Sequence, residues 1–281
     1  MTPAEHGILG FLLMVTAVAF FVIAVPGYWV IRNIWPQSGW NLGGSISTSC
    51  FKKYDLFVVG ALVLFYGLQW KLNQGQPFAL EKISVASVIS SSVFYLILAA
   101  AVPFLLFRRT HLAEFFGIRW AEWRWIFMII PVFLIAIFIC AALLKMTGWH
   151  DRIISYFGSQ VQGSVKLIMT SHDIPLLLAI TFSAVIVAPI AEEIIFRGYL
   201  YPVAKRYSEK WFATIFSAML FGVVHMNLLG LPMLILIGLA LVLLYEKTGS
   251  IWPCILCHMA FNGFSIGMIF LARFLKLPFS A

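Results

Sequence analysis

Long apolar segments are the feature that most limits how this chain can fold. A helix needs about 20 apolar residues to cross a bilayer. Hydrophobic residues make up 62% of the chain and charged residues 11%, whereas ordinary soluble domains contain about 45–50% and about 25%. A soluble fold of this length has too little interior to bury so much apolar surface. We therefore predict an all-α, polytopic transmembrane bundle of about eight helices. The predicted helices span residues 8–31, 54–72, 83–107, 124–146, 174–204, 211–226, 231–246 and 249–272.

The segments between these helices add detail to the prediction. The first apolar segment has no Lys or Arg ahead of it, and a cleaved signal peptide normally begins with a basic region. We therefore expect this segment to remain as a permanent helix. Gly230 and Pro232 separate the sixth and seventh helices and predict a tight hairpin. Residues 151–173 mix polar and apolar side chains, which indicates an interfacial helix or a lid.

The basic residues predict an orientation rather than a nucleic-acid partner. The net charge is +8, but Lys and Arg cluster between the apolar segments, where they face lipid headgroups. One set of loops holds twelve of them and the other set holds seven. The positive-inside rule then places the richer set in the cytoplasm and both termini outside. The richer set is Arg32, Lys52, Lys53, Arg108, Arg109, Arg119, Arg124, Arg197, Lys205, Arg206, Lys210 and Lys247.

Two adjacent carboxylates interrupt the fifth predicted helix. Ionisable groups within membrane segments are candidates for function because they are expensive to bury. Glu193 and Arg197 are four residues apart in the favourable order for a helical ion pair. Glu192 points about 100° away from Glu193 around the helix. We expect Arg197 to neutralise Glu193, which can be a structural role, and Glu192 to remain free to act as a general base.

Two further helices carry polar residues at a similar depth. His225 follows Phe221 by one turn, and His258 and Asn262 are four apart on one helix face. Asn is a poor choice for a lipid-facing position, so this face should look into the bundle. Counted at 1.5 Å per residue, the polar groups lie about 12–21 Å from the predicted cytoplasmic helix ends. A single membrane histidine is more often a packing residue, so the interpretation depends on all the clusters together.

The cysteines suggest two other interpretations. Cys254, Cys257 and His258 form the C-x-x-C-H pattern of haem attachment. That chemistry needs an exposed segment on the oxidising side, whereas this pattern begins an apolar helix. The same residues could bind zinc together with His225. Because three of the four cysteines fall in apolar segments, no disulfide framework is indicated.

Taken together, the clusters resemble the motifs of the CAAX-protease and bacteriocin-processing (CPBP) family of intramembrane proteases. That family carries E-E-x-x-x-R, F-x-x-x-H and H-x-x-x-N in this order. Gly198 and Leu200 fit its usual extension of the first motif, and the resemblance covers about residues 174–265. It implies catalytic roles for Glu192, His225, His258 and Asn262, with Glu193, Arg197 and Phe221 in support.

The resemblance implies a membrane endopeptidase with a polar cavity that opens toward the cytoplasm. We expect Glu192, helped by His225, to take a proton from water. His258 and Asn262 are expected to stabilise the oxyanion that forms. The sequence requires no cofactor, although a zinc ion held by Glu192, His225 and His258 is an alternative.

The resemblance also bears on domains, location and partners. Residues 1–150 form N-terminal transmembrane helices without an assigned role, and residues 151–281 form the catalytic core of one integral unit. We expect a multi-pass protein of the inner (plasma) membrane. Its expected partners are the bilayer, a peptide or protein substrate that can be lipidated, and a membrane protein docked on the N-terminal helices. No nucleic-acid partner is expected.

Two other functions fit parts of this pattern. A non-catalytic scaffold or bacteriocin-immunity protein could use the same pocket to hold a peptide. A transporter or channel could use buried carboxylates and histidines as a proton relay. The first four helices lack counterparts of the Glu and His clusters, which counts against the two related halves that many transporters have.

Overall fold

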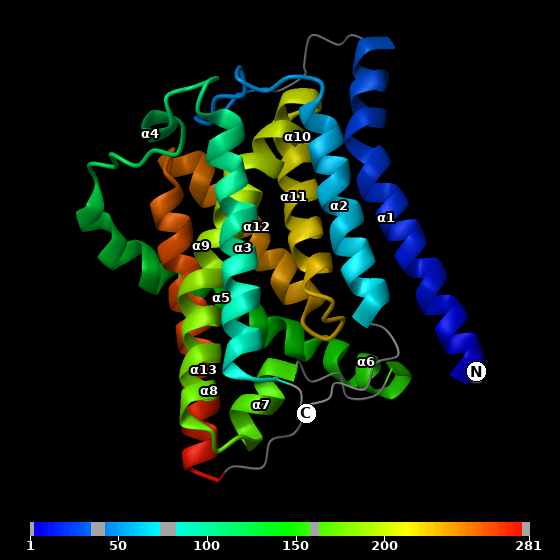
Figure 1. Cartoon of the computed structure of the whole chain (residues 1–281), viewed down its shortest axis with the longest axis vertical. Coiled ribbons are helices and arrows are strands. Elements are labelled where there is room, and N and C mark those ends of the chain that lie inside the picture. The colour runs from blue at the N-terminus through cyan, green and yellow to red at the C-terminus, as the bar shows by residue number, and fades with distance from the viewer. Residues whose placement is uncertain (1–2, 35–42, 74–82, 158–162, 277–281) are drawn as a thin grey trace.

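The computed structural model describes residues 3–34, 43–73, 83–157 and 163–276 (Figure 1). Helices dominate this part of the chain, and it contains no strand. The first half contributes α1 (Pro3–Ile34), α2 (Asp55–Asn73), α3 (Val85–Leu106), α4 (Leu112–Phe115), α5 (Ile126–Met146), α6 (Trp149–Phe157) and α7 (Gly163–Thr170). The second half contributes α8 (Ile174–Phe182), α9 (Ala188–Ile195), α10 (Tyr201–Tyr207), α11 (Lys210–Val224), α12 (Leu231–Thr248) and α13 (Ile251–Phe274).

Six of the described helical segments are long and apolar enough to cross a membrane, judged by length and composition. Two shorter apolar helices, Asp55–Gln69 and Lys210–Val224, accompany them. Together they correspond to the eight segments predicted from the sequence, which confirms a polytopic helical bundle. The six longer segments are Val15–Ile34, Val85–Leu106, Trp123–Met146, Ile174–Tyr207, Leu231–Thr248 and Ile251–Phe274.

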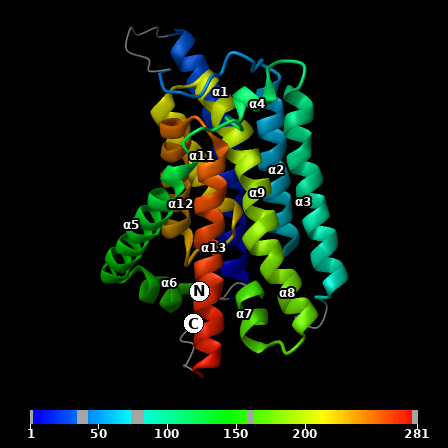
Figure 2. The same cartoon turned by 90° about the vertical axis from the view of Figure 1, so that its left-hand side faces the viewer.

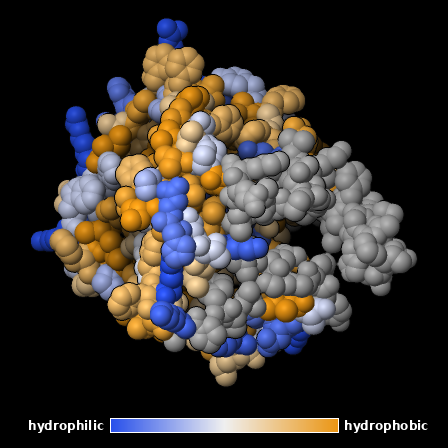
Figure 3. Space-filling view, turned by 60° about the horizontal axis from the view of Figure 1, so that its bottom comes forward, coloured by the Kyte–Doolittle hydropathy of each residue, from blue (hydrophilic) through white to orange (hydrophobic). Residues whose placement is uncertain are grey.

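The outer surface of the bundle is rich in large apolar side chains. Phe57 on α2 is 80% exposed and Phe127 on α5 is 82% exposed, which in water would oppose folding. Figure 3 shows that apolar residues cover much of the visible surface, with a band of hydrophilic residues between them. The chain is therefore an integral, multi-pass membrane protein whose exposed apolar side chains face lipid.

The two ends of the bundle differ in what they carry. One end, called the α7 end here, holds α6, α7, the start of α8 and the end of α13 (Figures 1 and 2). The other, called the α4 end, holds α4, the end of α10 and the start of α2. The mixed segment 151–173 forms parts of α6 and α7, and its residues 158–162 lie outside the described residues.

The predicted hairpin between the sixth and seventh helices is confirmed. It joins α11 to α12, and the two helices pack closely because glycines face the contact. A methyl group on Gly222 would meet Ile235 at 2.6 Å, and one on Gly238 would meet the backbone of Ala218 at 3.0 Å. This close approach brings α12 against the helix that carries His225.

The predicted orientation needs a correction. The predicted set of twelve loop residues includes Arg197 and Lys205, but both side chains are fully buried in ion pairs. They therefore cannot face lipid headgroups, and the charge bias between the two ends is smaller than the sequence suggested.

Candidate active site

The two carboxylates lie on a long helix whose α-helical hydrogen bonding changes to π-helical at two places. Residues 174–207 run as α8, α9 and α10, joined by π-helical turns at Ser183–Val187 and Phe196–Leu200. π-turns inside α-helices are frequent at functional sites. Glu192 and Glu193 lie on α9, between the two turns.

Prolines explain where these turns occur. Pro189 and Pro202 each follow a π-turn by two residues. Proline has no amide hydrogen, and its ring clashes with the carbonyl four residues earlier in an α-helix. A locally wider helix relieves that clash. It also leaves the Ala184 carbonyl without its helical donor, because the next five-residue hydrogen bond would need an amide hydrogen on Pro189.

Asn262 fills the gap left by Pro189. Its side-chain Nδ2 donates to the Ala184 carbonyl at 2.9 Å. Asn262 faces the interior of the bundle, as predicted, but one of its two amide hydrogens is already engaged. The sequence signal for this contact is Pro189 in A-P-I-A-E-E, which lies outside the three motifs.

Glu193 is paired through one of its two oxygens, whereas its Oε2 is buried and has no hydrogen-bond partner among the described residues. Its Oε1 accepts from Arg197 Nη1 at 2.9 Å and from His258 Nδ1 at 2.9 Å. Arg197 also donates to the Gly238 carbonyl at 3.0 Å and lies 4.7 Å from the ring centre of Phe221. The i,i+4 ion pair predicted from the sequence is present, whereas the contact with His258 was not foreseen.

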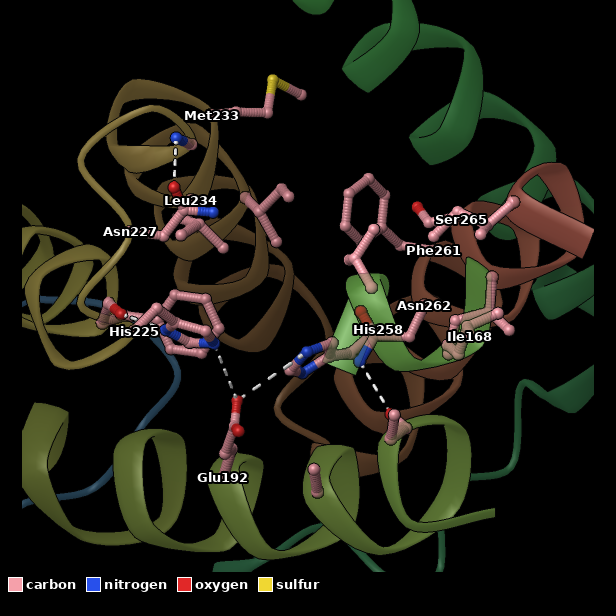
Figure 4. A pocket seen from close by; sticks show the side chains of 18 of the residues that line it. Ile168, Glu192, His225, Asn227, Met233, Leu234, His258, Phe261, Asn262 and Ser265 are labelled. Atoms are coloured by element: carbon pink, nitrogen blue, oxygen red, sulfur yellow. Dashed lines mark hydrogen bonds and ion pairs between the residues drawn. The ribbon is translucent and has the colours of Figure 1, made fainter. Parts of the chain in front are cut away.

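The two histidines present their Nε2 atoms to Glu192. His225 Nε2 lies 3.6 Å and His258 Nε2 3.8 Å from Glu192 Oε2. Figure 4 shows both imidazoles pointing toward this one carboxylate oxygen. Phe221 packs against both rings, with centroid distances of 4.7 Å to His225 and 5.6 Å to His258. The three motifs therefore meet at one point.

The contacts of the Nδ1 atoms determine which nitrogen of each histidine carries the hydrogen. His225 Nδ1 lies 2.6 Å from the Phe221 carbonyl, and a carbonyl can only accept a hydrogen bond. His225 Nδ1 must therefore carry the hydrogen, so the neutral ring has a lone pair on Nε2. The ionised Glu193 likewise favours hydrogen on His258 Nδ1.

Glu192 differs from its neighbour because it has no counterpart, among the described residues, of the hydrogen bonds that Glu193 Oε1 accepts from Arg197 and His258. Its Oε2 atom is buried and has no hydrogen-bond partner among the described residues. The distances to the histidines are too long for direct hydrogen bonds. A single water molecule can bridge polar atoms at such separations.

These groups line a cavity of about 370 Å³. Glu192, His225, His258 and Asn262 form its polar wall.

The cavity lies toward the α7 end of the bundle, because its lining also includes Val165 and Ile168 of α7 and Asn227 of the α11–α12 hairpin. The expectation that both termini lie outside therefore conflicts with the expectation that this cavity opens to the cytoplasm, because α1 starts and α13 ends at the α7 end.

The zinc alternative at Glu192, His225 and His258 stays a prediction, whereas the C-x-x-C-H pattern can be placed in the structure. Within the described residues, no group of three or more His, Cys, Asp or Glu side chains has an arrangement that could hold a metal ion. Cys254 and Cys257 are fully buried, and Cys254 Sγ donates to the Leu241 carbonyl at 3.3 Å. The C-x-x-C-H residues therefore pack inside the bundle and offer no exposed attachment site.

Comparison with known proteins agrees with the motifs. Residues 174–264 match the family described as type II CAAX prenyl endopeptidase Rce1-like. This range contains all three motifs.

Residues 174–264 are therefore similar to the Rce1-like family.

A curated relative gives a second similarity. The Bacillus subtilis (strain 168) protein named "Putative membrane peptidase YdiL" is 28% identical over 123 residues. The match covers 44% of this chain and 49% of the relative, so the chain spans about half the length of the relative it matches. No solved structure matches the chain. The division predicted at residue 150 stays a prediction, although α3 packs on α9 and α5 packs on α12 and α13.

Proposed function

We propose that this protein is an intramembrane endopeptidase that hydrolyses a peptide bond of a membrane-associated substrate with a water activated by Glu192. One observation carries the proposal: Glu192 Oε2, buried and without a hydrogen-bond partner among the described residues, faces the Nε2 atoms of two histidines at 3.6 and 3.8 Å. The similarity to the Rce1-like family supports peptide hydrolysis as the reaction.

The first step is activation of water. A water between Glu192 and His225 can donate one hydrogen to Glu192 Oε2 and the other to the lone pair on His225 Nε2. Its own lone pair then faces the cavity, where the scissile carbonyl enters. Glu192 takes the proton as the water oxygen bonds to the carbonyl carbon. General-base catalysis of this kind contributes about 10²–10⁴-fold to the rate.

The second step is stabilisation of the oxyanion and release of the amine. Asn262 keeps one Nδ2 hydrogen that is not used by Ala184, and it can donate this hydrogen to the oxyanion. His258 can donate from Nε2 only as the imidazolium, because its Nδ1 hydrogen is held by Glu193. When the tetrahedral intermediate collapses, Glu192 returns its proton to the leaving amine.

Glu193 and Arg197 have a supporting role in this proposal. Arg197 compensates the charge of Glu193, and Glu193 holds His258 by Nδ1 so that Nε2 faces Glu192. Partners that fix the second nitrogen of a functional imidazole also set its tautomer. No step requires a metal ion.

We further propose that the cavity opens to the cytoplasm of an inner (plasma) membrane. This reverses the orientation that the loop charges predict, because the cavity lies toward the α7 end, which carries fewer basic residues. Burial of Arg197 and Lys205 lowers the number of basic residues that can face headgroups in the richer set of loops from twelve to ten, against seven in the other set of the sequence. The remaining bias is weak, and the resemblance to the Rce1-like family favours the cytoplasmic opening.

Cleavage of a mixed peptide library by purified protein tests the proposed reaction. The library includes lipidated peptides, and the samples are wild type and Glu192→Gln, each with and without a strong zinc chelator. We expect wild type to cleave with or without chelator and the variant to lose cleavage. Loss of wild-type cleavage in chelator would favour a metal mechanism. Full cleavage by the variant would contradict the role of Glu192.

A further inference from the structure

A second cavity lies beside the active-site cavity at the α7 end. It has a volume of about 520 Å³ and lies between the end of α5, α6 and the first turn of α12. We call it the α5–α6 groove. Met233 lines both cavities, so the groove adjoins the space in front of Glu192.

Specific contacts hold the walls of this groove. Trp149 Nε1 donates to the Leu229 carbonyl at 3.2 Å, which ties α6 to the α11–α12 hairpin. Arg152 donates to the Thr147 carbonyl at 2.9 Å across the turn between α5 and α6. The same hairpin places Asn227 in the active-site cavity. The groove and the active site therefore share a structural element.

The chemistry of the lining indicates what fits. Leu144, Leu229 and Met233 form an apolar floor, whereas Lys145 and Asp151 form a charged rim. A hydrocarbon chain would contact only the floor and make no hydrogen bond with the exposed side chains of Lys145 and Asp151. An extended peptide offers apolar side chains and a polar backbone within each 3.3–3.6 Å step along its length. A few placed polar groups in an apolar cavity are typical of a site that orients its ligand.

We propose that the α5–α6 groove is a second substrate subsite that binds an extended peptide segment next to the scissile bond. An apolar side chain of the substrate packs on Leu144 and Met233, and its backbone contacts the rim formed by Lys145 and Asp151. This inference rests on the proposed endopeptidase function and adds a specificity determinant away from the catalytic groups.

Neighbouring leucines on α5 provide a matched test. Leu144 lines the groove, whereas Leu143 is 58% exposed on the lipid-facing side. Leu144→Trp fills the groove, and Leu143→Trp adds the same ring outside it. Cleavage kinetics are measured for a peptide that reaches the groove and for a truncated one that ends in the active-site cavity.

For the long peptide we expect Leu144→Trp to raise KM about tenfold, with kcat little changed, because overpacking opposes ligand entry. The truncated peptide should be cleaved equally by wild type and both variants, and Leu143→Trp should match wild type throughout. Equal KM values for the long peptide in both variants would overturn the proposal. Selectivity that follows an attached hydrocarbon chain instead of peptide length would also overturn it.

Binding separates this inference from the proposed reaction. Affinity for a fluorescent long peptide is measured with Glu192→Gln alone and combined with Leu144→Trp. Weaker binding in the combined variant, with no cleavage by wild type, would support the subsite and contradict the endopeptidase function. Equal binding by both proteins would reject the subsite, whether or not wild type cleaves.

Discussion

Two clusters of buried charge involve the long helix of residues 174–207, and they differ in how completely the carboxylate is paired. Toward the α4 end, Glu246 accepts from Tyr201 at 2.6 Å, from Lys205 at 2.5 Å and from the Ser45 amide at 2.9 Å. Near the cavity, Glu192 Oε2 has no hydrogen-bond partner in the part of the chain that the structure describes. A paired buried charge holds elements together, whereas an unpaired one is retained where chemistry needs it.

The same substitution in both clusters makes this contrast measurable. Glu192→Gln should lower kcat/KM by about 10³-fold, because the amide cannot take a proton from water. Thermal unfolding in detergent should change little, since Glu192 Oε2 has no hydrogen bond to lose. A variant that unfolds at much lower temperature would instead show that Glu192 stabilises the bundle.

Arg197→Met tests the ion pair that connects structure and site. We expect a loss of about 4 kcal/mol in unfolding free energy, because removing one partner leaves a buried charge uncompensated. The folded fraction should also lose activity, since Glu193 then repels Glu192. Arg197→Lys serves as the control and should recover part of the stability. Wild-type stability in Arg197→Met would contradict a structural role for the pair.

Glu246→Gln is the counterpart at the other cluster. It should lower the free energy of unfolding by about 2 kcal/mol, because Lys205 is left buried with weaker partners. Activity per folded molecule should stay at the wild-type level, measured by cleavage below the unfolding transition. A large loss of kcat would show that this cluster also shapes the active site.

Asn262→Ala tests whether the two amide hydrogens of Asn262 have separate roles, one in stability and one in catalysis. Loss of the bond to the Ala184 carbonyl alone should lower stability by about 1 kcal/mol. Loss of an oxyanion donor should lower kcat by about 10²–10³-fold. We expect both effects. A drop in stability without a drop in kcat would assign Asn262 to the support of α9 alone.

Cysteine labelling tests the orientation and should not alter activity. Cys140 is first replaced by Ala, and the other three native cysteines are buried. Burial raises the pKa of the Cys50 thiol, which keeps it unreactive. With an impermeant maleimide on intact cells, Ser49→Cys should react and Thr170→Cys should not. The reverse pattern would place the active-site cavity outside the cytoplasm.

The sequence predicted much of the site because its motifs fall in apolar helices. Glu192, His225 and His258 meet as expected, and Asn262 lines the same cavity. It did not predict the bond from His258 to Glu193, because that contact depends on how α13 crosses α9. The sequence also did not show that Arg197 is buried, because the motif does not indicate how deep its arginine lies in the bundle.

The sequence by itself determined that the chain folds in a bilayer and which residues can form the site. Its apolar segments require a bilayer, and its three polar motifs define which residues can take part in chemistry. Only the tertiary structure decided which carboxylate is paired, where Asn262 donates, and which end of the bundle carries the cavity. These depend on the rotation and crossing of helices, which are set by packing contacts between distant segments, such as Gly238 against Ala218.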